Sequence, residues 1–166
     1  ARLEDAQLEG AVLSRANLSG ARLERANVAR GVLRGARLSG ASLQGADLSG
    51  AQLQLANLSE ARAQGADLSA ASLEGALLRN AELEGANLSR SLLYAADLAG
   101  AKLAGADLTA AMIWRTVPPS EEGLALADTA EIVLRQPREQ DLARPGANPR
   151  SDDATLSVRL TEDPAR

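Results

Sequence analysis

Hydrophobic residues recur at every fifth position along the first two thirds of this chain. From residue 1 to residue 115, 23 consecutive units of five residues follow one another without an insertion. The third position of a unit is leucine in 20 of the 23 units, and the first position is alanine in 21. The remaining positions are mostly polar residues or glycine. A fixed short period of this kind predicts a repeat architecture, in which neighbouring units stack and bury a continuous core.

The period excludes a helix and favours short extended segments. Five residues make about 1.4 turns of an α-helix, so the leucines would spread around the helix axis. In an extended segment, the first and third positions lie two residues apart and point to the same side. Glycine occupies the fifth position in 11 units, and it tolerates the positive φ that tight corners often need. The pattern therefore predicts a coil of extended segments and corners, with alanine and leucine inside.

Several units match a known signature closely. The units ANLSG at 16–20, ADLSG at 46–50 and ADLTA at 106–110 resemble the A(D/N)Lxx repeat of the pentapeptide-repeat family. The resemblance covers residues 1–115 and implies an all-β fold, a right-handed quadrilateral parallel β-helix with four units per coil. It also implies that the third position is the central inward residue and the first position a small inward residue beside it. The rod would then be roughly 27 Å long, at about 4.8 Å per coil.

Two inward positions depart from the pattern. Ala63 stands at a leucine position, so we expect a gap or a shifted neighbour beside it. Ser91 stands at an alanine position, and we expect its inward hydroxyl to bond to a neighbouring backbone group. At the regular positions, each buried leucine should contribute about 1.5–3 kcal/mol to stability.

The five-residue period ends at Arg115, which divides the chain into a repeat domain at 1–115 and a C-terminal cap or tail at 116–166. Pro118 and Pro119 follow shortly afterwards, and proline lacks the N–H group that a ladder of strands requires. A terminal repeat needs protection of its open edge, so we expect a cap to begin here.

The strongly apolar part of the tail is the segment 123–136. It suits a helix that starts with a capping box at 128–131, and it also suits a hairpin that turns near Asp128. We expect loop or disorder over 137–154 and a short strand over 155–160.

Composition removes several chemistries from consideration. The chain has no cysteine and no histidine, which excludes disulfides, histidine general bases and the usual zinc ligands. Residues 1–115 carry 12 acidic and 12 basic side chains, whereas the tail carries 10 acidic and 6 basic ones. A rod without a global basic field does not favour direct nucleic-acid binding. No apolar run approaches about 18 residues, so we expect no transmembrane segment. We also expect a cytoplasmic location, and no cofactor because no residue pattern for one is present.

Four units per coil would assign every outward residue to one of four sides. On side 1, which starts with the unit at 1–5, basic and acidic residues form paired rows that are typical of a solvated surface. On side 2, aspartate and asparagine recur between Gln7 and Asp107. Their oxygens suit either a cation-binding ladder or hydrogen bonds to backbone groups at the corners, and the family signature favours the latter. Side 4 is mixed.

Side 3 is the predicted interaction site. Outside the inward positions, residues 1–115 contain eight large apolar residues, and seven of them fall on this side. We call these seven the apolar stripe: Val12, Val32, Leu55, Leu92, Tyr94, Met112 and Trp114. Tyr94 and Trp114 are also the only aromatic residues of the chain, and aromatic residues are enriched at interfaces. Such stripes are uncommon on soluble monomers, so we expect the chain's own tail or a second chain to cover it.

These features predict a non-catalytic structural or protein-interaction scaffold that displays the surface of a β-helical rod. The partner would be another protein or a second copy of the chain, and no small-molecule substrate is expected. An alternative follows from the resemblance, because some pentapeptide-repeat proteins mimic DNA, inhibit DNA gyrase and confer quinolone resistance. Their rods are acidic. This sequence departs from their pattern, because its rod has no net charge and its central inward positions contain no phenylalanine. An enzyme is not expected, because serine and threonine lack a histidine partner and the carboxylate pairs have no evident cleft.

Overall fold

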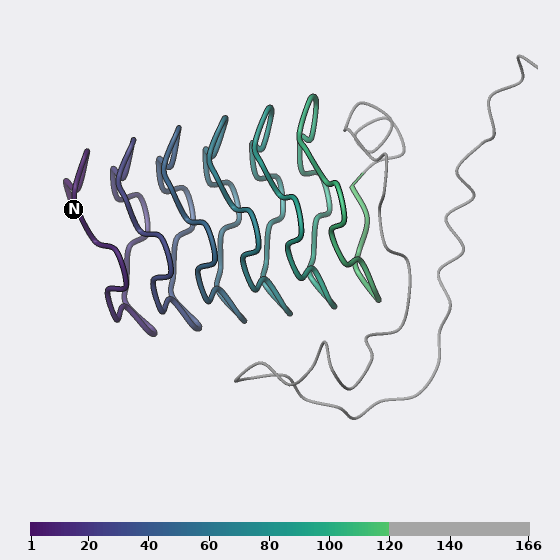
Figure 1. Cartoon of the computed structure of the whole chain (residues 1–166), viewed down its shortest axis with the longest axis horizontal. Coiled ribbons are helices and arrows are strands. Elements are labelled where there is room, and N and C mark those ends of the chain that lie inside the picture. Colours follow the sequence, from purple (N-terminus) through teal and green to yellow (C-terminus); the bar gives the residue numbers. More distant parts are fainter. Residues whose placement is uncertain (120–166) are drawn as a thin grey trace, which may run out of the picture.

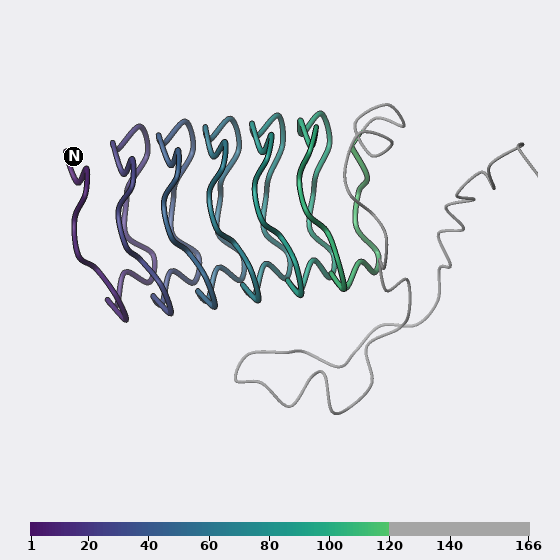
Figure 2. The same ribbon diagram turned by 45° about the horizontal axis from the view of Figure 1, so that its top comes forward.

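The computed structural model describes residues 1–119, and this part of the chain is a rod of stacked coils (Figure 1). The coils follow one another in chain order from the N-terminus, and the same order is visible after a turn of 45° (Figure 2). Parallel β-bridges join residues that are 20 positions apart, for example Arg2 with Arg22 and Asp97 with Val117. Each coil therefore contains 20 residues, or four units, as the resemblance implied.

Regular secondary structure in residues 1–119 consists of isolated parallel bridges, without a helix or a longer strand. The bridging residue is the second position of each unit. Backbone bonds flank each bridge: the N–H of Leu3 donates to the carbonyl of Arg22 over 2.7 Å, and the N–H of Arg22 donates to that of Ala1 over 3.0 Å. The described part of the chain offers no helix with the length and hydropathy that crossing a bilayer requires.

The bridging residues form four columns, one on each side of the rod. The columns of sides 1 to 4 begin at Arg2, Gln7, Val12 and Asn17 and end at Lys102, Asp107, Met112 and Val117, respectively. The register is uninterrupted, so the outward residues of every fourth unit lie on the same side.

The fourth and fifth positions of each unit turn the chain through a corner. The N–H of Ala6 donates across the corner to the carbonyl of Leu3 over 3.2 Å, and equivalent bonds recur along the rod. The fifth position has a positive φ in all 23 units, in 11 glycines and in 12 other residues, with values from 52° at Arg115 to 70° at Gly100. The predicted role of the fifth position is therefore confirmed. The positive φ also occurs at fifth positions that carry a side chain. The backbone N–H of such a residue can donate to the next coil, as the N–H of Asp5 donates to the carbonyl of Glu24.

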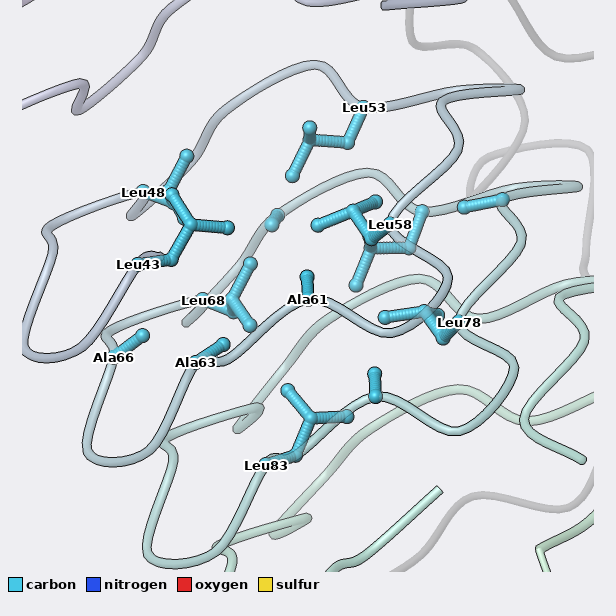
Figure 3. Close-up of a cluster of buried hydrophobic side chains, with 14 of the residues drawn as sticks. Leu43, Leu48, Leu53, Leu58, Ala61, Ala63, Ala66, Leu68, Leu78 and Leu83 are labelled. Atoms are coloured by element: carbon cyan, nitrogen blue, oxygen red, sulfur yellow. The ribbon is translucent and has the colours of Figure 1, made fainter. Parts of the chain in front are cut away.

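The core is a stack of leucine and alanine side chains inside the rod. Figure 3 shows Leu43, Leu48, Leu53 and Leu58 projecting inward from successive sides of the coils. The third-position leucines from Leu23 to Leu108 are at most 2% exposed. Burial of this completeness gives each leucine its full hydrophobic contribution of about 1.5–3 kcal/mol. Ala63 lies in the coil between those of Leu43 and Leu83 and is 1% exposed, so its short side chain does not open the interior to solvent (Figure 3).

Gly31 replaces the usual inward alanine next to a valine that replaces the usual leucine. A Cβ atom at Gly31 would lie 2.9 Å from the carbonyl oxygen of Val28, 3.0 Å from its Cγ1 and 3.1 Å from the Cδ1 of Leu33. Contacts this short would force a backbone shift, so this corner has no room for the methyl group that 21 other units carry.

We expect Gly31→Ala to lower the free energy of unfolding by about 1 kcal/mol, because the methyl group overpacks the corner. Urea denaturation at a fixed protein concentration measures the change. Ala36→Gly is the matched control at the same position of the next unit: there the loss of the methyl group should destabilise the rod. A more stable Gly31→Ala variant would contradict the expected clash.

The prediction that the inward hydroxyl of Ser91 bonds to a neighbouring backbone group is wrong. The Ser91 side chain is 0% exposed, as predicted, but its Oγ has no hydrogen-bond partner in the structure. The neighbouring backbone groups are already paired, since the N–H of Ser91 donates to Leu88 and the N–H of Met112 donates to the carbonyl of Ser91. The hydroxyl group therefore lies unpaired in an apolar interior.

The ladder continues past Arg115 into part of a further unit. Thr116 takes the inward first position, where its Oγ1 donates to the carbonyl of Leu93 over 2.6 Å. Val117 pairs with Asp97, after which two prolines follow. The predictions of a helix or hairpin, a loop and a strand at 123–160 lie outside the residues that the structure describes.

Candidate functional site

Side 1 carries a row of ion pairs. Arg22 lies 3.0 Å from a carboxylate oxygen of Glu4 and 3.6 Å from one of Glu24. Further along, Lys102 lies 3.1 Å from Glu82, whose other oxygen accepts a bond from Gln64 over 2.6 Å. The predicted rows of opposite charge are therefore confirmed. Exposed pairs of this kind contribute about 0–1 kcal/mol each, so side 1 is a solvated surface with paired charges.

The aspartate and asparagine residues of the second position bind the backbone of their own corner. Asp47 Oδ1, for example, accepts the N–H of Ser49 over 2.9 Å. The same bond to the fourth-position N–H occurs at all eight such residues: Asn17, Asn27, Asp47, Asn57, Asp67, Asn87, Asp97 and Asp107. These bonds support a structural role for the polar column on side 2. Residues 1–119 contain no group of three or more acidic side chains arranged to hold a metal ion.

Asp107 has two hydrogen-bond donors at its corner. It accepts bonds from the side chain and the backbone N–H of Thr109, the latter over 2.8 Å, and they hold the pKa of Asp107 below its ordinary value of 3.8. Because the folded-state pKa lies below the unfolded value, the stability from this contact is fully present above the unfolded pKa. It is lost as the pH falls through the folded pKa.

We expect Asp107→Asn to keep the backbone bond, as Asn87 does one coil earlier, and to weaken the acid-side loss of stability. Asp107→Ala removes the bond and should cost about 1 kcal/mol at neutral pH. Urea midpoints measured between about pH 7 and pH 3 separate the two variants. An unchanged pH slope for Asp107→Asn would contradict the assignment.

Side 3 brings together all seven residues of the apolar stripe. Its column of bridges joins Val12 to Val32 and Leu92 to Met112, and between these pairs stand the polar Gln52 and Ser72. Val12 is 77% exposed and Leu55 is 70% exposed, while the other five stripe residues are half-buried. The register of the bridges places the stripe residues on one side of the rod. The cover predicted for them remains a prediction.

Two features of side 3 were not predicted from the sequence. Leu55 lies over the next coil: a Cβ atom at Gly75 would be 2.8 Å from its Cδ2. Gln54 is 5% exposed, and its Oε1 has no hydrogen-bond partner in the structure. The contact of Leu55 joins residues 20 apart in the chain, and the five-residue pattern contains no signal for contacts between coils. On side 4, Leu77 and Val117 add exposed apolar surface, at 41% and 49%.

The fold defines a solenoid repeat protein, and the apolar stripe lies on one of its four sides. Comparison with known families matches "Pentapeptide repeats (8 copies)" at residues 1–40, 32–69, 56–93 and 71–109. The chain belongs to the pentapeptide-repeat family. Members of this family generally have structural or interaction roles rather than enzymatic ones. No curated protein matches the chain.

Several solved structures are similar to this chain. QnrB1, a plasmid-mediated fluoroquinolone resistance protein, is 21% identical over 76% of this chain and 62% of its own, with a TM-score of 0.67. This similarity confirms the right-handed quadrilateral β-helix. HetL, a protein involved in heterocyst differentiation regulation in the cyanobacterium Nostoc sp. strain PCC 7120, is 33% identical over 69% of this chain and 65% of its own, with a TM-score of 0.37. The matched region thus spans less than two thirds of either relative.

Proposed function

We propose that this protein is a non-catalytic scaffold that binds a protein partner through the apolar stripe on side 3. The observation that carries the proposal is the segregation of large apolar residues. Seven of the eight outward ones within residues 1–115 share this side, where even scatter would place about two. Apolar side chains gathered on one side, with Val12 and Leu55 at least 70% exposed and the aromatic Tyr94 and Trp114 at one end, are typical of protein interaction sites.

The polar contacts on sides 1 and 2 support the same proposal. Side 1 pairs its charges, and the polar column of side 2 bonds to its own corners. The groups in these ion pairs and corner bonds already have partners, whereas the large apolar side chains of the stripe gain hydrophobic free energy from being covered. The balance of 12 acidic and 12 basic residues within residues 1–115 does not favour the DNA-mimic alternative, because mimicry of a duplex requires a strongly acidic rod.

Site-specific photo-crosslinking in cells tests the proposed function. A photoreactive amino acid at Leu92 should give covalent adducts with a protein partner. The matched control is Leu77, also a leucine at the second position but on side 4, where adducts should be few. Mass spectrometry identifies the captured protein, and either a different protein or a second copy supports the proposal. Equal yields at both positions, or none at either, would contradict it.

A further inference from the structure

We infer that side 3 is a self-complementary interface through which two copies of this chain associate as antiparallel rods. The inference rests on the proposed function and names the partner as a second copy. Two-fold symmetric interfaces are the commonest among oligomers, and they require the same patch to match itself in reverse order. Side 3 meets this requirement in its sequence of side chains.

The bridging column of side 3 is a palindrome: its apolar and polar residues follow the same order from either end of the rod. From the first coil to the sixth, it consists of two apolar, two polar and two apolar residues: Val12, Val32, Gln52, Ser72, Leu92 and Met112. When two rods lie antiparallel about a two-fold axis across the rods, each column faces its own copy in reverse. In the register that superposes all six coils, Val12 faces Met112 of the second copy, and Val32 faces Leu92 of the second copy. Apolar residues then meet apolar ones, and Gln52 meets Ser72.

The other three sides fail the same comparison. On side 2, the reversed column places Asp47 against Asp67 of a second copy, which brings together like charges. On side 1, Arg2 would face Lys102. On side 4, Leu77 would face Asn57 and leave an apolar side chain against a polar one. In the bridging columns, a match of apolar with apolar and polar with polar residues at every pair, without like charges, is therefore specific to side 3.

Leu55 lies at the point where the symmetry axis would pass. The axis of the six-coil register runs between the third and fourth coils, and Leu55 reaches from the third coil over Gly75 of the fourth. Gly75 has no side chain to obstruct it. Since Leu55 is 70% exposed in the single chain, two copies of Leu55 would meet at the axis and bury each other.

The fourth-position column is mixed, and the fifth-position column has an unfavourable contact at its ends. In the fourth-position column, Gln54 faces Glu74 of the second copy, and Trp114 faces the polar Ser14 of the second copy. Arg34 faces Tyr94 of the second copy, and a guanidinium group over an aromatic ring is attractive. Arg15 faces Arg115 of the second copy at each end of the interface, where solvent and salt screen the repulsion.

The size of the surface sets the expected strength of association. Side 3 has 18 outward positions in six units, and 16 of them carry a side chain because Gly35 and Gly75 are glycines, whereas stable interfaces commonly use about 20–30 residues per partner. We therefore expect a dissociation constant of about 1–100 μM. A docked tail segment runs in one direction and has no need of reversed symmetry, so the palindrome favours the second copy.

Sedimentation equilibrium of the full chain tests association. As the protein concentration rises through the micromolar range, the mass should increase from 17.2 kDa towards twice that value. Val32→Asp and Leu92→Asp should each weaken dimerisation by at least about tenfold, because a charge would enter an apolar contact. Leu77→Asp is the matched control on side 4 and should leave the mass unchanged. Circular dichroism shows whether each variant retains the fold.

Cysteine crosslinking tests the register, since the chain has no cysteine of its own. Under oxidising conditions, Leu55→Cys should form a disulfide-linked dimer across the axis. The double variant Val32→Cys/Leu92→Cys should also crosslink between chains. Val32→Cys alone should not, because the two copies of residue 32 lie about three coils, or roughly 14 Å, apart. Crosslinking of Val32→Cys as fast as that of the double variant would overturn the register.

A full chain that stays monomeric up to millimolar concentration would overturn the inference. If the fluorescence of Trp114 is then already shifted to shorter wavelength, residues 120–166 become the candidate cover. Photo-crosslinks from Leu92 to a different protein would still support the proposed function, so the two hypotheses can fail separately.

Discussion

Replacing Leu68 by alanine should lower the free energy of unfolding by about 2–5 kcal/mol, the largest effect that we expect from a single truncation in the rod. Leu68 is 0% exposed and lies in the fourth of six coils, so the leucines above and below it are also buried. The lost transfer energy and the remaining cavity act together. Urea denaturation followed by circular dichroism, at one fixed protein concentration, measures the difference.

Leu77→Ala is the matched control for Leu68→Ala. Leu77 is 41% exposed on side 4, so its truncation removes less buried surface and should cost less than about 1 kcal/mol. Similar losses for the two variants would show that the inward stack does not dominate stability.

Replacing Ser91 by alanine should raise the free energy of unfolding by about 1–2 kcal/mol. The Ser91 hydroxyl is 0% exposed and has no hydrogen-bond partner in the structure, so folding removes it from water without compensation. Alanine at this position matches the 21 units that already carry it. Thermal and urea denaturation both report the gain.

Thr116→Val is the contrasting control, because it removes a buried hydroxyl that does have a partner. Thr116 Oγ1 donates to the carbonyl of Leu93 over 2.6 Å, so its loss should destabilise the last coil by about 1 kcal/mol. Opposite signs for Ser91→Ala and Thr116→Val would support the hydrogen-bond argument. A destabilised Ser91→Ala variant would show that the hydroxyl has a partner in solution.

Membership of the pentapeptide-repeat family leaves the function of an individual protein to its outward side chains. The inward positions are almost uniform, and the corners differ little in conformation from one unit to the next. The differences between sides therefore carry the functional information. In this chain, side 1 carries ion pairs, whereas side 3 carries the apolar stripe. The bridging column of side 3 has the same order of apolar and polar residues from either end.

The amino-acid sequence by itself determined the inward positions, the corners and the composition of each outward side. A period of five with alanine and leucine two residues apart is sufficient for this, because backbone geometry decides locally which side chains share a direction. The family resemblance then supplied four units per coil, and with it the alignment of the apolar stripe. Tertiary structure decided three further features: the unpaired hydroxyl of Ser91, the crowded corner at Gly31, and the reach of Leu55 over Gly75. Leu55 and Gly75 are 20 positions apart and meet only after the chain has completed a coil, whereas Gly31 is crowded by Val28 and Leu33 through the fold of its own corner.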